Sequence, residues 1–354
     1  MPAEAKELLR VEHLRQYFTS GKSVTCAVDD VSFSLNKGEI LGLVGESGCG
    51  KTTTARSIIK LYQPTGGKVW FDGNLIASGA WEQEEAARQA KESLKQAAPE
   101  QKQAAQAALA QTKAECRHAR AQSRELRKKY SSVTQIQMIF QDPMASLNPR
   151  MTIKEIIAEG LRIRGMKDEK QIDRMVMDVL SKVGLLPEHA NRYPHEFSGG
   201  QRQRIGVARA IIMEPKLIIA DEPVSALDVS IQAQIINLLG QLREETGISI
   251  LFIAHDLSVV KYFSDRIGVM YFGHLVEMAS SNELFAHPLH GYTRALLFAI
   301  PMPDPHYEKR RRRIVYHAPE YSPAEQESLT LREVLPGHFV RCTEAEAEQF
   351  RRQA

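Results

Sequence analysis

The chain has 354 residues, and its 46 Lys and Arg against 43 Asp and Glu leave a formal net charge of +3. With 43% hydrophobic residues it is too apolar for a disordered chain, and a charge this small argues against a strongly cationic nucleic-acid binder. The sequence contains no run of about 18 apolar residues, so it predicts no membrane-spanning segment. Residues 1–10 lack the apolar core of a signal peptide, so we expect a cytoplasmic location.

The first part of the chain reads as short apolar runs separated by turns. Residues 39–44 form a compact apolar run that predicts a buried strand, and apolar residues with helical spacing follow over 51–62. Residues 69–71 followed by Asp72-Gly73 predict a strand that enters a tight hairpin.

A helical insertion occupies residues 79–129. Ala, Gln, Glu, Lys and Arg dominate it, all have high helix propensity, and Pro99 divides the stretch into two helices. Its apolar positions are mostly Ala, so we expect a helical hairpin that is exposed for most of its length, without a coiled-coil seam.

The second predicted helix of the insertion carries a basic stripe. Its members recur at spacings of 4, 3, 4 and 3 and so share one helix face: Lys113, Arg117, Arg120, Arg124 and Arg127. The stripe is either an ordinary solvated face or a contact for anionic lipid or an acidic partner subunit.

Strands and helices alternate after the insertion. Residues 131–140, 216–220 and 248–254 have strand character, and residues 151–185 predict helices separated by short loops. This alternation predicts a largely parallel α/β sheet, in which the carboxyl ends of the strands lie at one edge.

A phosphate-binding loop follows the first buried strand and opens a helix. The pattern predicts that Lys51 reaches the β- and γ-phosphates of a nucleotide and that the Thr52 hydroxyl binds Mg²⁺. Cys49 is either a thiolate favoured by Lys51 and the helix N-terminus, or a small residue that fits the loop. The residues predicted to bind the nucleotide here are Gly45, Glu46, Ser47, Gly48, Cys49, Gly50, Lys51, Thr52 and Thr53.

Polar residues follow the two later strands at the same predicted edge. Asp221 can hold Mg²⁺ through water, and Glu222 is placed to act as general base on an attacking water. His255 can donate a hydrogen bond to the γ-phosphate.

Together these residues resemble the ATP-binding-cassette ATPases. The sequence that carries the resemblance is Phe-Ser-Gly-Gly-Gln-Arg-Gln-Arg at 197–204, which is similar to the family's signature. The resemblance implies a dimer in which ATP lies between the phosphate loop of one subunit and the signature of the other. The signature residues expected at ATP are Ser198, Gly199, Gly200 and Gln201.

Further roles follow from the same resemblance. Gln141 resembles the Q-loop residue that contacts Mg²⁺ or water, Asp228 belongs to a stretch like the D-loop, and His255 resembles the switch histidine. Phe18 stands where the family has an aromatic ring on adenine, with Tyr17 adjacent.

The implied fold is an α/β P-loop NTPase of the ABC ATPase type. It has an antiparallel β subdomain and a helical subdomain, plus the inserted helical hairpin. The expected domains are an ATPase domain at 6–289, containing the insertion at 79–129 and the helical subdomain at 142–200, and a C-terminal extension at 290–354.

The flanks resemble oligopeptide/dipeptide permease ATPases at residues 144–150, 192–196 and 290–297, and residues 335–340 are similar to the second ATPase subunit of Gram-positive oligopeptide importers. The resemblance implies an ATPase that powers peptide import from the cytoplasmic face of the membrane, as a peripheral protein. Its implied partners are a sister ATPase subunit in a heterodimer, two transmembrane permease subunits and an extracytoplasmic peptide-binding protein, with no nucleic acid.

Two alternatives stay open. Related ATPases serve importers of nickel or oligosaccharides. The second alternative is a soluble ABC ATPase that acts on DNA. In such ATPases the inserted coiled coils lie between the Q-loop and the signature, whereas the insertion in this chain precedes Gln141.

The tail departs from relatives that hold an iron–sulfur cluster. Beyond Cys116 only Cys342 remains, so four thiolate ligands cannot come from the tail, and we predict no cluster. The basic run at 309–313 is either a solvated tail or a contact with membrane or nucleic acid.

Overall fold

The computed structural model describes residues 6–21, 23–129, 135–299 and 316–353. The chain divides into two compact units: unit one comprises residues 1–36, 48–133 and 271–275, and unit two comprises residues 37–47, 134–270 and 276–354. The division falls between Ser47 and Gly48, inside the predicted phosphate-binding loop, so this loop is a covalent connection between the units.

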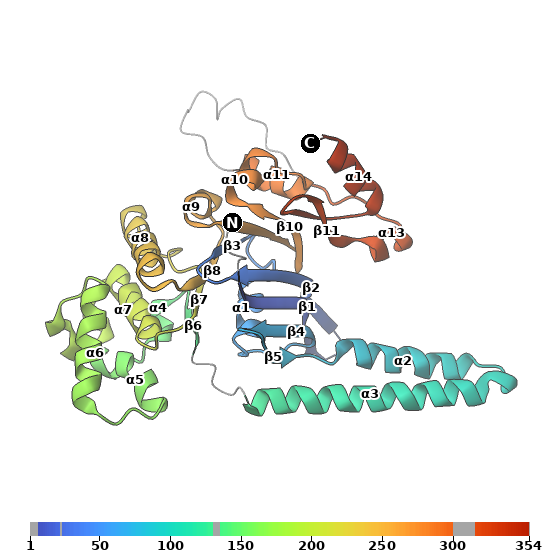
Figure 1. Cartoon of the computed structure of the whole chain (residues 1–354), viewed down its shortest axis with the longest axis horizontal. Coiled ribbons are helices and arrows are strands. Elements are labelled where there is room, and N and C mark those ends of the chain that lie inside the picture. The colour runs from blue at the N-terminus through green and yellow to red at the C-terminus, as the bar shows by residue number, and fades with distance from the viewer. Residues whose placement is uncertain (1–5, 22, 130–134, 300–315, 354) are drawn as a thin grey trace. The chain divides into compact units, whose positions relative to one another are not determined.

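Unit one contains an antiparallel sheet in the order β2-β1-β4-β5 (Figure 1). Sequence patterns did not reveal β1 or β2 as continuous strands. Register shifts interrupt the pairing of β1 and β2, and His13 and Asp30 take left-handed conformations, so apolar and polar residues do not alternate regularly. The strands are β1 (Glu7–Ser20), β2 (Ser23–Asn36), β4 (Gly66–Phe71) and β5 (Asn74–Ser78).

The predicted hairpin at Asp72-Gly73 is confirmed. Phe71 pairs with Asn74, and the two residues between them have φ of 47° and 77°. Two positive φ values in a two-residue loop are the geometry whose twist matches that of the flanking strands.

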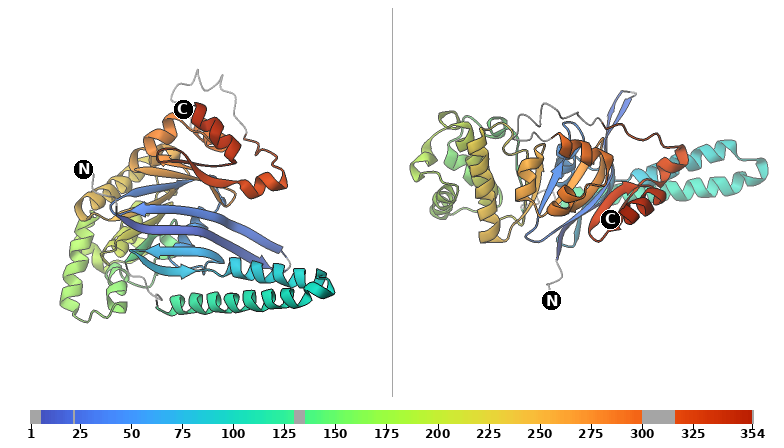
Figure 2. Two further views of the ribbon diagram at one scale, coloured as in Figure 1. Left: turned by 45° about the vertical axis from the view of Figure 1, so that its right-hand side comes forward. Right: turned by 90° about the horizontal axis from the view of Figure 1, so that it is seen from above.

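The helical insertion is also confirmed. It consists of α2 (Trp81–Gln96), a 3-10 turn at Pro99–Gln101 and α3 (Lys102–Lys129), and the two helices lie side by side (Figure 2). Leu109 and Cys116 are its only buried helical residues, so the hairpin is largely exposed, as expected.

Polar contacts join the hairpin's helices to each other and to the sheet of unit one. Arg120 of the basic stripe pairs with Glu84 of α2 at 2.8 Å. The Ser123 hydroxyl donates to the Ser78 carbonyl at 2.8 Å and accepts from Gln63 Nε2 at 3.0 Å. A contact of the stripe with lipid or an acidic partner stays a prediction.

Unit two is built on the predicted parallel sheet. The whole sheet has the order β11-β12-β10-β9-β3-β8-β7-β6, and the pairs β9-β3, β3-β8, β8-β7 and β7-β6 are parallel. All residues of β3, β7 and β8 are buried, which explains their continuous apolar runs. The strands of this part are β3 (Ile40–Val44), β6 (Ile136–Ile139), β7 (Leu217–Asp221), β8 (Ser249–Ala254), β9 (Arg266–Tyr271) and β10 (His274–Ser280).

Helices connect these strands. The helix predicted over 51–62 ends earlier, at Ile58, and residues 151–185 contain two helices as expected. The helices are α1 (Lys51–Ile58), α4 (Pro143–Ser146), α5 (Ile153–Ile163), α6 (Glu169–Lys182), α7 (Gly199–Ile211), α8 (Val229–Thr246), α9 (Leu257–Phe263), α10 (Ser281–Ala286) and α11 (Gly291–Phe298), with 3-10 turns at Pro187–Asn191 and Pro194–Glu196. Within the described ranges, none of the helices combines the length and the apolar character needed to cross a membrane.

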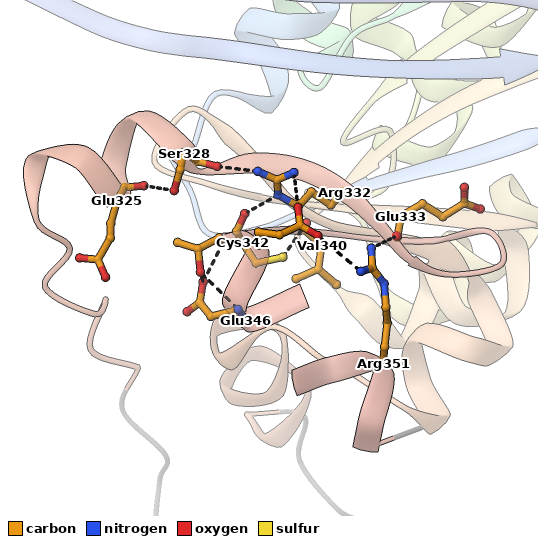
Figure 3. Close-up of polar contacts among 10 residues, drawn as sticks. Glu325, Ser328, Arg332, Glu333, Val340, Cys342, Glu346 and Arg351 are labelled. Carbon is orange, nitrogen blue, oxygen red and sulfur yellow. Dashed lines mark hydrogen bonds and ion pairs between the residues drawn. The ribbon is translucent and has the colours of Figure 1, made fainter. Parts of the chain in front are cut away.

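The C-terminal region is folded, which the sequence did not predict. Its elements are α13 (Pro323–Ser328), β11 (Thr330–Leu335), β12 (His338–Cys342) and α14 (Glu344–Gln353). Strand β12 pairs with β10, matching Glu277 with Val340, and so extends the main sheet. Arg332 donates to the carbonyls of Ser328 and Cys342 (Figure 3). The basic run at 309–313 lies outside the described residues.

Gly67 tests how tightly the sheet of unit one is packed. A Cβ at Gly67 would overlap the carbonyl oxygens of Glu12 and His13, whereas one at Gly73 would meet nothing within 4 Å. Both residues have φ near 80°, at 79° and 77°, so both alanine variants carry a backbone cost of about 1–2 kcal/mol. We expect Gly67→Ala to lower the free energy of unfolding by about 3 kcal/mol, because the overlap adds to that cost. Urea denaturation of both variants measures the difference, and equal losses would contradict the close approach.

Candidate functional site

The parallel register of unit two brings the predicted polar residues to one edge of the sheet. Val44 at the end of β3 pairs with Ala254 at the end of β8, and Asp221 at the end of β7 pairs with Ile253. Ile139 at the end of β6 pairs with Ala220. The residues that follow these strands, including the start of the phosphate loop, therefore emerge at the same edge.

The Glu222 carboxylate is the centre of a cluster at this edge. Gln141 Nε2 donates to Glu222 Oε2 at 3.1 Å, and His255 Nδ1 lies 3.2 Å from the same oxygen. The Glu222 side chain is 14% exposed, and that of His255 is 56% exposed. The structure thus brings Gln141, Glu222 and His255 into contact.

The backbone at Glu222 is unusual. Its φ is 44°, a left-handed conformation that residues with a Cβ rarely adopt, and its N–H donates to the Ile253 carbonyl at 2.9 Å. Strained conformations of this kind persist where the surrounding structure enforces them, and they cluster at functional sites. The carboxylate of this residue contacts Gln141 and His255.

The cluster has the chemistry of a general base with a neighbouring hydrogen-bond donor. An ionised carboxylate can accept a proton from water, and the Gln141 amide keeps one of its oxygens oriented. When the neutral His255 ring carries its proton on Nδ1, Nδ1 donates a hydrogen bond to Glu222 and Nε2 is an acceptor.

The predicted magnesium ligands offer oxygen atoms. Asp221 provides a carboxylate, Thr52 a hydroxyl and Gln141 an amide oxygen, all hard donors of the kind that Mg²⁺ takes. Across the described ranges, no group of three or more His, Cys, Asp or Glu side chains could hold a metal ion.

The phosphate loop has the backbone that its glycines predict. Gly45, Gly48 and Gly50 have φ of 149°, 82° and 106°, and α1 begins directly after Gly50. Such a succession lets backbone N–H groups turn toward an anion at a helix N-terminus. The loop is fixed at two points, because Gly273 N–H donates to the Cys49 carbonyl at 3.0 Å and Glu46 N–H donates to the Tyr292 hydroxyl at 3.0 Å.

Of the two alternatives for Cys49, its surroundings disfavour the thiolate. Cys49 is 6% exposed, and this burial raises the pKa of its thiol despite the neighbouring Lys51, whose Nζ lies 3.7 Å from Cys49 Sγ. Removing a thiolate from water costs more here than one nearby ammonium group returns. Cys49 is thus a small residue that fits the loop.

The signature residues form the start of α7. Ser198 and Gln201 build a capping box, in which Gln201 N–H donates to Ser198 Oγ at 3.3 Å and Ser198 N–H donates to Gln201 Oε1 at 3.0 Å. A Cβ at Gly200 would lie 2.5 Å from Ile231 Cγ2 of α8, so only glycine allows this approach of the two helices. Asp228 is the N-cap residue of α8.

The two candidate aromatic residues differ in their surroundings. Phe18 is exposed and meets Tyr62 edge to face, with the ring centroids 5.2 Å apart. Tyr17 is engaged in the packing of unit one, because its hydroxyl donates to Asp29 at 2.6 Å and its ring packs against Trp81. Phe18 is therefore the better candidate for stacking on a base.

Sequence reasoning missed Tyr292 as part of the phosphate loop's environment. The residue lies in the 290–297 segment that resembles peptide permease ATPases, but that resemblance carried no role for it. Its contact with Glu46 joins residues separated by 246 positions, so neither periodicity nor a local motif could have indicated it.

Family models match two parts of the chain. The model described as "ABC transporter" matches residues 28–133 and 108–225, and the one described as "Oligopeptide/dipeptide transporter, C-terminal region" matches residues 276–326. The first match contains the phosphate loop, the signature and Glu222, and the second contains Tyr292.

Curated relatives match over almost their full length. The chain is 51% identical to the oligopeptide transport ATP-binding protein OppF of Bacillus subtilis, over 98% of this chain and 99% of that protein. It is 44% identical to the dipeptide transport ATP-binding protein DppF of Lactococcus lactis, over 99% of each.

Solved structures share the fold. The cbiO1 protein of Clostridium perfringens, part of the ABC transporter complex cbiONQ, superimposes with a TM-score of 0.58 at 23% identity over 80% of this chain and 92% of that one. A dimeric ATP-binding cassette bound to ADP and phosphate gives a TM-score of 0.58 at 24% identity, over 77% of this chain and 99% of that one.

The burial of Cys49 makes a prediction about thiol reactivity. Cys26 is exposed in the same chain, so it is an internal reference. We expect iodoacetamide at pH 7.5 to modify Cys26 well before Cys49, because the buried thiol is both inaccessible and protonated. Mass spectrometry of peptides over a time course measures the two modification rates, and equal rates would support the thiolate alternative for Cys49.

Proposed function

The chain belongs to the ABC transporter family, and from this we propose that it is the ATP-hydrolysing subunit of an importer of oligopeptides or dipeptides. The observation that carries the catalytic part is the Glu222 carboxylate, held by Gln141 and His255 at the edge where the phosphate loop begins. The names of the relatives, which describe oligopeptide and dipeptide transport, support peptides as the cargo over nickel or oligosaccharide.

We propose that the phosphate loop binds the phosphates of ATP. Backbone N–H groups of residues 45–53 and the Lys51 ammonium group oppose the phosphate charge, and Phe18 stacks on adenine. Thr52, Gln141 and Asp221 would hold Mg²⁺, which neutralises charge on the phosphates when it is bound.

Hydrolysis then depends on the Glu222 cluster. Glu222 orients the attacking water and accepts its proton, and Gln141 keeps the carboxylate oriented. When both ring nitrogens of His255 carry protons, Nδ1 donates to Glu222 and Nε2 can donate a hydrogen bond to the γ-phosphate. The contacts of Gln141 and His255 with the Glu222 carboxylate support these roles.

The remaining half of each ATP site comes from a second ATPase domain. Ser198, Gly199, Gly200 and Gln201 present the N-terminus of α7 to the ATP of the partner, with Asp228 at the same dimer interface. We propose a heterodimer with a sister ATPase subunit, two transmembrane permease subunits and an extracytoplasmic peptide-binding protein. The chain then works as a peripheral protein at the cytoplasmic face of the membrane and binds no nucleic acid.

We propose that the ATPase domain spans residues 6–289, with the insertion at 79–129 and the helical subdomain at 142–200, and that residues 290–354 form the extension.

No iron–sulfur cluster is expected, because Cys342 is the only cysteine in the sequence beyond Cys116. Cys342 lies in β12, where burial raises the pKa of its thiol to about 11.

Glu222→Gln tests the general base. The variant keeps the shape and loses the basic oxygen, so we expect ATP hydrolysis to fall by a factor of about 100 or more while ATP binding persists. Turnover and equilibrium ATP binding are measured on the assembled transporter. Glu245→Gln, an exposed change near the end of α8, should leave both unchanged. Normal turnover by Glu222→Gln would remove the proposed base.

Lys51→Ala tests the cargo. Cells whose only copy of the chain carries this change should lose uptake of a radiolabelled tripeptide, because the phosphates lose their ammonium partner. Immunoblotting verifies that the level of the chain is unchanged. Loss of nickel or maltotriose uptake with normal peptide uptake would favour one of the alternative importers.

A further inference from the structure

The phosphate loop has a tether that comes from the C-terminal extension. Tyr292 of α11 accepts a hydrogen bond from the backbone N–H of Glu46 at 3.0 Å. The tyrosine is 2% exposed, so its ring is fixed by packing and its hydroxyl has a defined position. The bond acts on the second residue of the loop, directly after Gly45, whose φ is 149°.

The position of Tyr292 is fixed by the start of α11. Leu289 and His290, the two residues before the helix, donate their N–H groups to the Glu277 carboxylate at 2.7 and 3.1 Å. His290 then caps the helix, because its Nδ1 accepts the Tyr292 N–H at 3.2 Å. A single carboxyl group on β10 therefore sets where the chain enters the helix that carries the tyrosine.

Glu277 is itself held by the antiparallel pair of β11 and β12, called here the C-terminal hairpin. His338 of β12 places Nε2 at 2.8 Å from Glu277 Oε1, and both side chains are 0% exposed. Burying a carboxyl group costs free energy unless hydrogen bonds compensate, so Glu277 depends on the strand that brings His338. The pairing of Glu277 with Val340 keeps that strand in register.

We propose that Tyr292 is a positioning residue for ATP binding, and that the C-terminal hairpin acts on the phosphate loop through His338, Glu277 and α11. The proposal rests on the proposed ATPase function of the same loop. A loop rich in glycine loses conformational entropy when it closes around phosphates, and a tether near its start reduces that loss before ATP arrives. The extension thus raises ATP affinity without touching ATP.

Tyr292→Phe removes only the hydroxyl. The net contribution of one hydrogen bond corresponds to a factor of about three to ten, so we expect the Kd and KM for ATP to rise by that factor in the full-length chain, with kcat changed less than about twofold. Tyr262→Phe is the matched control, because that side chain is 87% exposed on α9, and it should leave both constants unchanged. A kcat loss at unchanged Kd, or no change at all, would overturn the proposal.

His338→Ala tests the origin of the tether. We expect this change to raise the Kd for ATP about as much as Tyr292→Phe does. The Kd of the double variant should be at most about twice that of either single variant, because both changes release the same contact. His338→Gln, which keeps a donor, should restore most of the affinity. Fully multiplicative effects would contradict the link, and so would wild-type affinity in His338→Ala. If His338→Ala does not fold, Tyr292→Phe still decides whether the tether acts on ATP binding.

These outcomes are separate from those for the proposed function. Failure of the unmodified chain to bind ATP would refute the ATPase function itself, whereas normal binding by the unmodified chain and by Tyr292→Phe would refute only the tether.

Discussion

The parallel pairing of β3, β8, β7 and β6 is the constraint on which the candidate site depends. Strands β3, β7 and β8 are buried on both faces, so their register is fixed by packing, and the residues that follow the four strands emerge at one edge. If the register of β7 shifted by one residue, the Asp221 side chain would turn to the other face of the sheet. The shift would also separate Glu222 from Gln141. The hydrogen bonds at 3.1 and 3.2 Å are thus a consequence of strand register.

Unusual backbone conformations occur where this edge meets the site. Glu222 is left-handed although it has a Cβ, which costs free energy, whereas the positive φ values of three phosphate-loop residues are accessible because these residues are glycines. The buried sheet supplies the packing that holds such conformations. The same logic applies at Gly200, where the lack of a Cβ lets α7 approach α8 and so sets the position of the signature segment.

The C-terminal extension adds a second layer of control over the loop. Its hairpin joins the main sheet through β10, and a buried histidine and carboxyl group connect that strand to the helix that contacts Glu46. Polar groups with 0% exposure are costly unless they are paired, which makes this connection sensitive to any change at either end. The extension thereby contacts the start of the phosphate loop.

The sequence by itself determined the chemistry: the glycine loop, Lys51, the acids after β7, His255, the signature and the helical hairpin at 79–129 all follow from local patterns and strand order. It did not reveal β1, whose bulges hide the alternation, or the folded extension, whose short strands are stable only against β10. It also left open a Cys49 thiolate, which burial disfavours. Only the tertiary structure decided the Gln141–Glu222–His255 contacts and the Tyr292 tether, because distances between residues remote in sequence, and the burial that sets a pKa, exist only once the strands have packed.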